Sequence, residues 1–73
     1  MMTRSEHLAW CKKRALEILD CGDVVGAFAS MASDLDKHPE TAGHVAKRMG
    51  AMMLTAGMLA LPREMRKFIE GLN

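Results

Sequence analysis

Residues 23–37 read DVVGAFASMASDLDK, and this stretch decides the fold class. Its large apolar side chains recur every three or four residues, which is the repeat of an amphipathic α-helix with one face toward a core. Asp23 is a suitable N-cap, and His38 before Pro39 avoids helical geometry, so we expect a helix from Val24 to about Lys37. The predicted core face consists of Val24, Val25, Phe28, Met31, Ala32 and Leu35, whereas the polar residues Ser30, Ser33, Asp34 and Asp36 lie off it.

The preceding residues predict another helix, which forms a hairpin with this one. Thr3-Arg4-Ser5-Glu6 has the pattern of a capping box, in which the Thr3 hydroxyl and the Glu6 carboxylate each accept a hydrogen bond from a backbone amide. Gly22 is typical of the left-handed position that ends a helix. At about 100° per residue, one wedge of this helix carries the predicted core residues Leu8, Cys11, Ala15, Ile18 and Leu19.

Two further helices are predicted after Pro39. One runs from about Thr41 to about Leu59, and the other opens on Pro62 and stops at Gly71. The last helix turns Met65, Phe68 and Ile69 inward. The sequence therefore predicts an all-α fold with one domain over residues 1–73, a compact bundle of about four short helices that begins with a helical hairpin.

Composition excludes several classes of protein. Ten Lys and Arg against nine Asp and Glu leave a net charge of +1, which gives no overall field for a nucleic acid or an acidic membrane. The longest uncharged run, Met49 to Leu61, would form about 20 Å of helix, and a bilayer core is about 30 Å thick. The first residues lead into charge rather than an apolar signal segment. We therefore expect a cytoplasmic protein without a membrane span.

Few residues could carry chemistry. His7 and Cys11 lie one helical turn apart, and Cys21, His38 and His44 could add metal ligands. Cys11, however, falls in the predicted core wedge, where a free cysteine behaves as a small apolar side chain. The sequence has no Cys-x-x-Cys pair and no Gly-rich phosphate loop. We therefore expect no metal, no other cofactor and no enzymatic activity.

Four segments resemble one group of proteins. They are EHLAWCK (residues 6–12), SMASDL (30–35), KHPET (37–41) and MRKFIEG (65–71). In this order they are similar to short uncharacterised proteins of tailed bacteriophages and prophages, over nearly the whole chain. The resemblance implies a phage protein made in the host bacterial cytoplasm, and it brings no catalytic or binding residue with it. Phages commonly use proteins of this size to bind and redirect host machinery.

The expected function is therefore that of an accessory protein, which binds and modulates or inhibits a host bacterial protein complex such as a CRISPR effector or the transcription machinery. Trp10 lies outside the core wedge among charged residues, where it covers another helix or anchors an interface. The expected partner-binding residues are Trp10, Lys13, Arg14, Arg63, Arg66 and Lys67. Residues 41–73 carry five basic and two acidic side chains (+3), and residues 1–40 carry five and seven (−2), so a small nucleic-acid-associated regulator is an alternative.

The third possible function is that of a homo-oligomeric structural protein. From Gly50 onward the helix predicted over residues 41–59 is apolar on every side, and such a helix must be buried on every side. Either it is the central helix of the bundle, or Leu54 and Met58 form a patch for a second copy or a host protein. Gly43, Gly50 and Gly57 are seven residues apart and, unless they lie in loops, form one row for close backbone approach. Packing of this row within the chain, against the first helix, is favoured over packing between chains.

Overall fold

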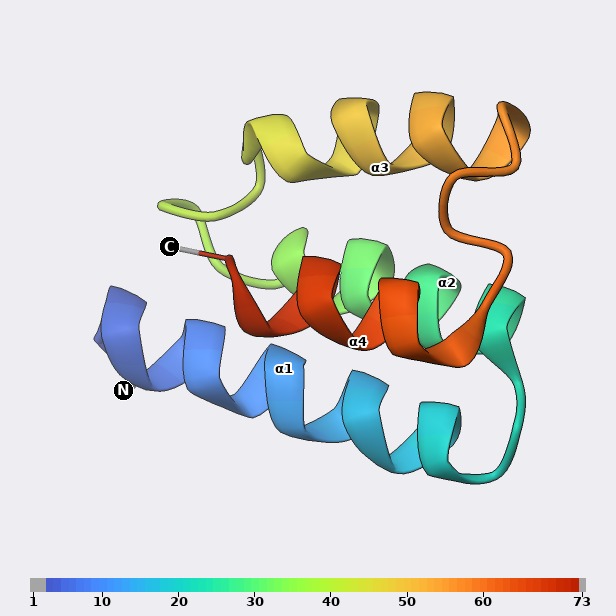
Figure 1. The fold of residues 1–73 in the computed structure, drawn as a ribbon. Helices are drawn as coiled ribbons and strands as arrows, with labels where there is room; N and C mark the ends of the chain where they lie inside the picture. Colours follow the sequence, from blue (N-terminus) through green and yellow to red (C-terminus); the bar gives the residue numbers. More distant parts are fainter. Residues whose placement is uncertain (1–2, 73) are drawn as a thin grey trace.

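The computed structural model describes residues 3–72, and these residues form four α-helices and no β-strand. The helices are α1 (Arg4–Asp20), α2 (Val24–Leu35), α3 (Val45–Thr55) and α4 (Pro62–Glu70). α1 and α2 form the expected hairpin, joined by residues 21–23 (Figure 1). The predicted all-α bundle is confirmed.

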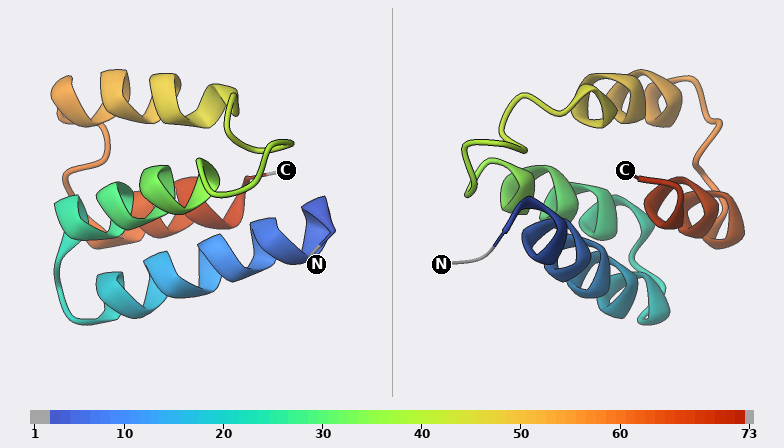
Figure 2. Two further views of the ribbon diagram at one scale, coloured as in Figure 1. Left: turned by 180° about the vertical axis from the view of Figure 1, so that it is seen from behind. Right: turned by 90° about the vertical axis from the view of Figure 1, so that its left-hand side faces the viewer.

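The helices lie in three layers (Figures 1 and 2). α2 and α4 form the middle layer, α1 packs against both of them on one side, and α3 lies over them on the other. α3 is therefore an outer helix. Of the two alternatives for this helix, the central position in the bundle is excluded, because within residues 3–72 α3 has a neighbouring layer on one side alone.

The core is built by α1, α2, α4 and the segment that joins α3 to α4. Its largest fully buried apolar side chains are Met31, Leu35, Leu59, Met65 and Ile69. Four of the five residues in the predicted wedge of α1 are buried, namely Leu8, Cys11, Ala15 and Leu19, and Ile18 is half-buried. Local periodicity thus predicts most of the core.

α2 presents a different face to the core than its spacing predicts. Val25 is 63% exposed, whereas Ala27 and Asp34 are buried. Asp34 can be buried because Arg14 of α1, the helix that packs against α2, forms an ion pair with its carboxylate. The placement of Val25 on the core face and of Asp34 off it is therefore wrong.

Local signals set most helix ends where the sequence predicts them. Thr3 and Glu6 form the capping box, in which the Thr3 amide donates to Glu6 Oε1 at 3.0 Å and the Glu6 amide donates to Thr3 Oγ1 at 3.1 Å. Asp23 caps α2 by accepting a hydrogen bond from the Gly26 amide at 2.8 Å. Gly22 follows α1 in a left-handed conformation, with φ of +89°.

The segment between α2 and α3 is longer than predicted. α2 ends at Leu35 rather than near Lys37, and the Thr41 hydroxyl donates to the Leu35 carbonyl at 2.6 Å. α3 begins at Val45 rather than at Thr41, because the His44 ring caps it by accepting a hydrogen bond from an amide of the first turn at 3.0 Å. Hydrogen bonds between side chains and the backbone, made by Thr41 and His44, thus take the place of helical hydrogen bonds at the two ends of this loop.

α3 ends at Thr55, earlier than predicted, because Gly57 adopts a left-handed conformation with φ of +80°. The Met58 amide donates to the Met53 carbonyl at 2.8 Å, as in a Schellman motif. Gly43 and Gly57 therefore lie outside the helix. The glycine row does not form on α3.

Gly50 is the member of that set that lies within α3, and it is buried. Its backbone faces the rings of Phe28 from α2 and Phe68 from α4, whose centroids are 6.5 Å apart. A Cβ atom on Gly50 would lie 2.9 Å from Cζ of Phe68 and would overlap the Phe28 ring. Gly50 thus makes room within the chain for aromatic side chains of α2 and α4, and not for the backbone of the first helix as expected.

Gly57→Ala should lower the free energy of unfolding by about 1 kcal/mol, because alanine is strained at positive φ. Gly43→Ala is the matched control, since Gly43 has no positive φ and open space where a Cβ atom would stand. We expect no loss of stability in the control. Urea denaturation followed by circular dichroism measures both, and equal effects would contradict this account of the α3 end.

Candidate functional site

Asp34 is a buried carboxylate with polar partners from two parts of the chain. Its side chain is 2% exposed, and Arg14 Nε of α1 donates to its Oδ2 at 2.7 Å. Lys37, just after α2, donates to Oδ1 at 3.0 Å. Both carboxylate oxygens are therefore paired, which offsets the cost of burying the charge.

The Trp10 ring lies against the two cations that bind Asp34. The guanidinium carbon of Arg14 is 4.7 Å from the ring centroid, and Lys37 Nζ is 5.5 Å from it. Both distances are typical of cation–π contacts. The His7 ring is a further neighbour, with its centroid 5.5 Å from that of Trp10. We call these five residues, His7, Trp10, Arg14, Asp34 and Lys37, the Asp34 cluster.

His7 is buried and joins α1 to the end of α2. Its Nε2 lies 2.7 Å from the carbonyl oxygen of Asp34, and because a carbonyl only accepts, Nε2 carries the proton. Cys11 Sγ lies 3.5 Å from the same nitrogen. A protonated Nε2 cannot take the proton of the thiol, so His7 and Cys11 do not form an activated nucleophile in this arrangement.

The surroundings of Cys11 and Asp34 set the protonation states of these two side chains. Burial, together with the negative charge of Asp34, raises the pKa of the Cys11 thiol, which therefore stays protonated at neutral pH. Burial also acts to raise the pKa of Asp34, but hydrogen bonds from Lys37 and Arg14 outweigh it, and the net shift is downward. Asp34 is thus ionised at neutral pH and holds both cations.

Of the predicted binding residues on α1, the structure brings two together. Trp10 and Arg14 belong to the Asp34 cluster, whereas Lys13 is exposed on α1 and is not a member of it. Trp10 is half-buried and packs against the core. It therefore covers part of the bundle and also leaves part of its ring at the surface.

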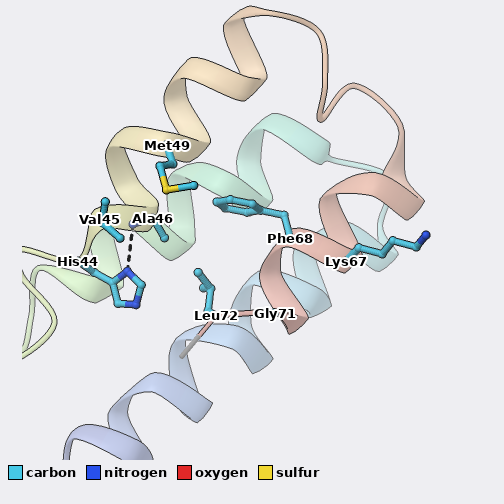
Figure 3. Close-up of a pocket in the computed structure, with 8 residues that line it drawn as sticks. All are labelled: His44, Val45, Ala46, Met49, Lys67, Phe68, Gly71 and Leu72. Carbon is cyan, nitrogen blue, oxygen red and sulfur yellow. Dashed lines mark hydrogen bonds between the residues drawn. The ribbon is translucent and has the colours of Figure 1, made fainter.

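The predicted residues of α4 are directed to different neighbours. Arg66 forms an ion pair with Asp20 of α1. Lys67 lines a hollow between α3 and α4 (Figure 3), and Arg63 is exposed in the first turn. These residues do not join Trp10 in one site.

Several basic side chains are engaged by acidic ones. Arg14 and Lys37 pair with Asp34, Lys47 with Asp36, and Arg66 with Asp20. Each pair lowers the positive charge that a phosphate backbone would meet, which weakens the argument for nucleic-acid binding.

The residues considered as metal ligands do not form one group, although His7 lies beside both Cys11 and His38. Cys21 is exposed beyond α1, and His44 caps α3. Within residues 3–72, no three His, Cys, Asp or Glu side chains gather in a group that could hold a metal ion. Nor does this part of the chain contain a helix with the length and hydropathy needed to cross a bilayer.

Asp34 and Lys37 are site residues that the sequence analysis does not predict, and His7 is considered there only as a metal ligand. A signal for Asp34 was present, since it lies about 60° from Met31 on a helical wheel, at the margin of the apolar face. Lys37 follows it by three residues, a spacing at which opposite charges meet. The contribution of Arg14 could not be read in this way, because it depends on how α1 packs.

No protein-family model matches the chain, and neither a curated protein nor a solved structure matches it.

Proposed function

We propose that this chain is a non-catalytic accessory protein of a phage or prophage, which binds a host bacterial protein in the cytoplasm and modulates or inhibits its activity. The phage origin rests on the resemblance of four segments to short phage proteins. The binding role rests on the Asp34 cluster. The host complex it targets, whether a CRISPR effector, the transcription machinery or another assembly, is to be identified by experiment.

The observation that carries the binding role is the arrangement of Trp10 between two cations fixed by one carboxylate. Arg14 and Lys37 are both half-exposed in their side chains, at 48% and 54%, while Asp34 holds their inner ends. Tryptophan and arginine are the residues most enriched at the centres of protein interfaces. Because these side chains are already ordered, binding loses little of their conformational freedom. Because two cations share one carboxylate, the cluster keeps a net positive charge, which suits an acidic patch on a partner protein.

Capture from a lysate of the bacterial host, followed by quantitative mass spectrometry, tests this proposal. Lys37→Gln and Trp10→Leu should each reduce the capture of the target at least about tenfold, a loss of about 1.4 kcal/mol. Arg48→Gln is the charge-matched control, because it removes one exposed cation from α3, away from the cluster. Circular dichroism must show that all variants remain folded.

Two outcomes would contradict the proposal. In one, the folded cluster variants capture the same proteins as the wild type. In the other, capture is lost on nuclease treatment and every basic change weakens it about equally, which is the behaviour of a nucleic-acid binder.

A further inference from the structure

α3 carries an apolar face that no part of residues 3–72 covers. Val45 is 62% exposed, Met49 51% and Met52 68%, and Ala56 at the C-cap is also exposed. Methionines with this exposure on one short helix are unusual for a surface that meets only water. The opposite side of α3 packs inward through Gly50, against Phe28 and Phe68.

The spacing of these side chains is that of a helix-pairing seam. Val45, Met49, Met52 and Ala56 follow one another at intervals of four, three and four residues. This is the repeat of the apolar positions in coiled coils, which keeps them in one row along the helix. Leu54 and Met58, expected for self-association, do not share the row, since Leu54 packs against the core and Met58 lies beyond the helix.

A hollow lies beside the N-terminal end of this row. It has a volume of about 460 Å³, lies between α3 and α4, and has Val45 and Met49 on one side and Phe68 and Leu72 on the other (Figure 3). Around Met52 and Ala56 the surface is open and is formed by α3 alone. The face therefore combines exposed methionines with one hollow at its N-terminal end.

We propose that this face binds a second copy of the chain, with the two α3 helices antiparallel. The seam itself carries no charge, so a second copy meets no like charge in it. Antiparallel pairing places Met49 opposite Met52 of the second copy and Val45 opposite its Ala56, which matches large residues with each other and a branched residue with a small one. It also sets the cationic N-terminal turns of α3, with Lys47 and Arg48, at opposite ends of the pair and aligns the helix dipoles favourably.

The size of the seam sets the strength of the dimer. An eleven-residue helix is about 16 Å long, so two α3 helices alone give a contact below the roughly 1,000 Å² of a stable interface. The hollow between α3 and α4 extends the contact to the exposed part of Phe68, whereas Leu72, which also lines it, is buried. We therefore expect a dimer that forms in the micromolar range and uses a surface other than the Asp34 cluster.

Analytical ultracentrifugation of the full chain from about 1 μM to about 500 μM tests the dimer. The wild type should shift from monomer to dimer, and Met52→Glu should weaken the association at least about tenfold, because it places a charge in the seam. Val25→Glu is the matched control, an equally exposed apolar residue on α2, and it should leave the association unchanged.

Disulfide trapping tests the direction of the helices. In a background with exposed Cys21 replaced by serine, the double variant Met49→Cys/Met52→Cys should form a cross-linked dimer on oxidation, whereas each single variant should not. A wild-type chain that is monomeric at every concentration, or a dimer that Met52→Glu leaves unchanged, would overturn the proposal. Efficient cross-linking of either single variant would overturn the antiparallel arrangement.

Discussion

Replacing Leu59 with alanine should lower the free energy of unfolding by about 3 kcal/mol. Leu59 is 2% exposed, although it belongs to the segment between α3 and α4 and not to a helix. Its side chain joins the core and so fixes the chain that returns from the outer layer to the middle layer. Truncation leaves a cavity at that point and loosens the segment that connects α3 to α4.

Leu61→Ala is the matched control for this effect. Leu61 is two residues away in the same segment but is 48% exposed, so its truncation should change stability by less than about 1 kcal/mol. Urea denaturation followed by circular dichroism compares the two. Because a small domain has only about 5 kcal/mol of stability in total, Leu59→Ala should also raise the unfolded fraction measurably without denaturant. Equal losses in the two variants would contradict the role of Leu59 as the anchor.

Helix ends and local periodicity are the features that could be predicted from the sequence. Thr3 with Glu6, Gly22 and Asp23 act on backbone groups within a few residues of themselves. Their effect is therefore independent of the tertiary fold, and each one is found where the pattern predicts it. Gly57 is a similar signal, but its spacing from Gly43 and Gly50 is also compatible with a row of glycines along the helix, so the sequence leaves both positions open.

The layer to which α3 belongs could not be predicted in the same way. Its apolar composition is compatible with burial on every side or with burial on one side and a second partner on the other. The choice depends on where α1 packs, and α1 covers the far side of α2 and α4. Periodicity describes the faces of one helix and does not specify the order of the layers.

The Asp34 cluster escaped prediction for a related reason. An aspartate next to an apolar face is usually solvated, and its burial requires a cation from another helix. Arg14 is close to Asp34 in space but 20 residues away in the sequence. The sequence places Trp10 among charged residues of its own helix, whereas its ring in the structure contacts Arg14 and also Lys37, which follows α2.

Asp34→Ala should lower the free energy of unfolding by about 2 kcal/mol at neutral pH. The loss is smaller than for a fully buried ion pair because Arg14 and Lys37 are half-exposed and water can solvate them once the carboxylate is gone. Glu17→Ala is the control, since it removes an exposed carboxylate from α1 and should change stability by less than about 0.5 kcal/mol.

The pH dependence of a further variant, Asp34→Asn, identifies the source of this stabilisation. Because the pKa of Asp34 is lower in the folded chain than its ordinary value of 3.8, the unfolded chain binds the proton more tightly. The stabilisation is therefore complete well above pH 3.8 and is lost as the pH falls through the folded-state pKa. The difference in unfolding free energy between the wild type and Asp34→Asn should accordingly be largest at neutral pH and shrink below pH 3.8. A difference in unfolding free energy that stays constant through that range would mean that Asp34 stabilises the fold by packing alone. Arg14 and Lys37 would then not be held in place by its charge, and the proposed role of Trp10 as a binding surface depends on these two ordered cations.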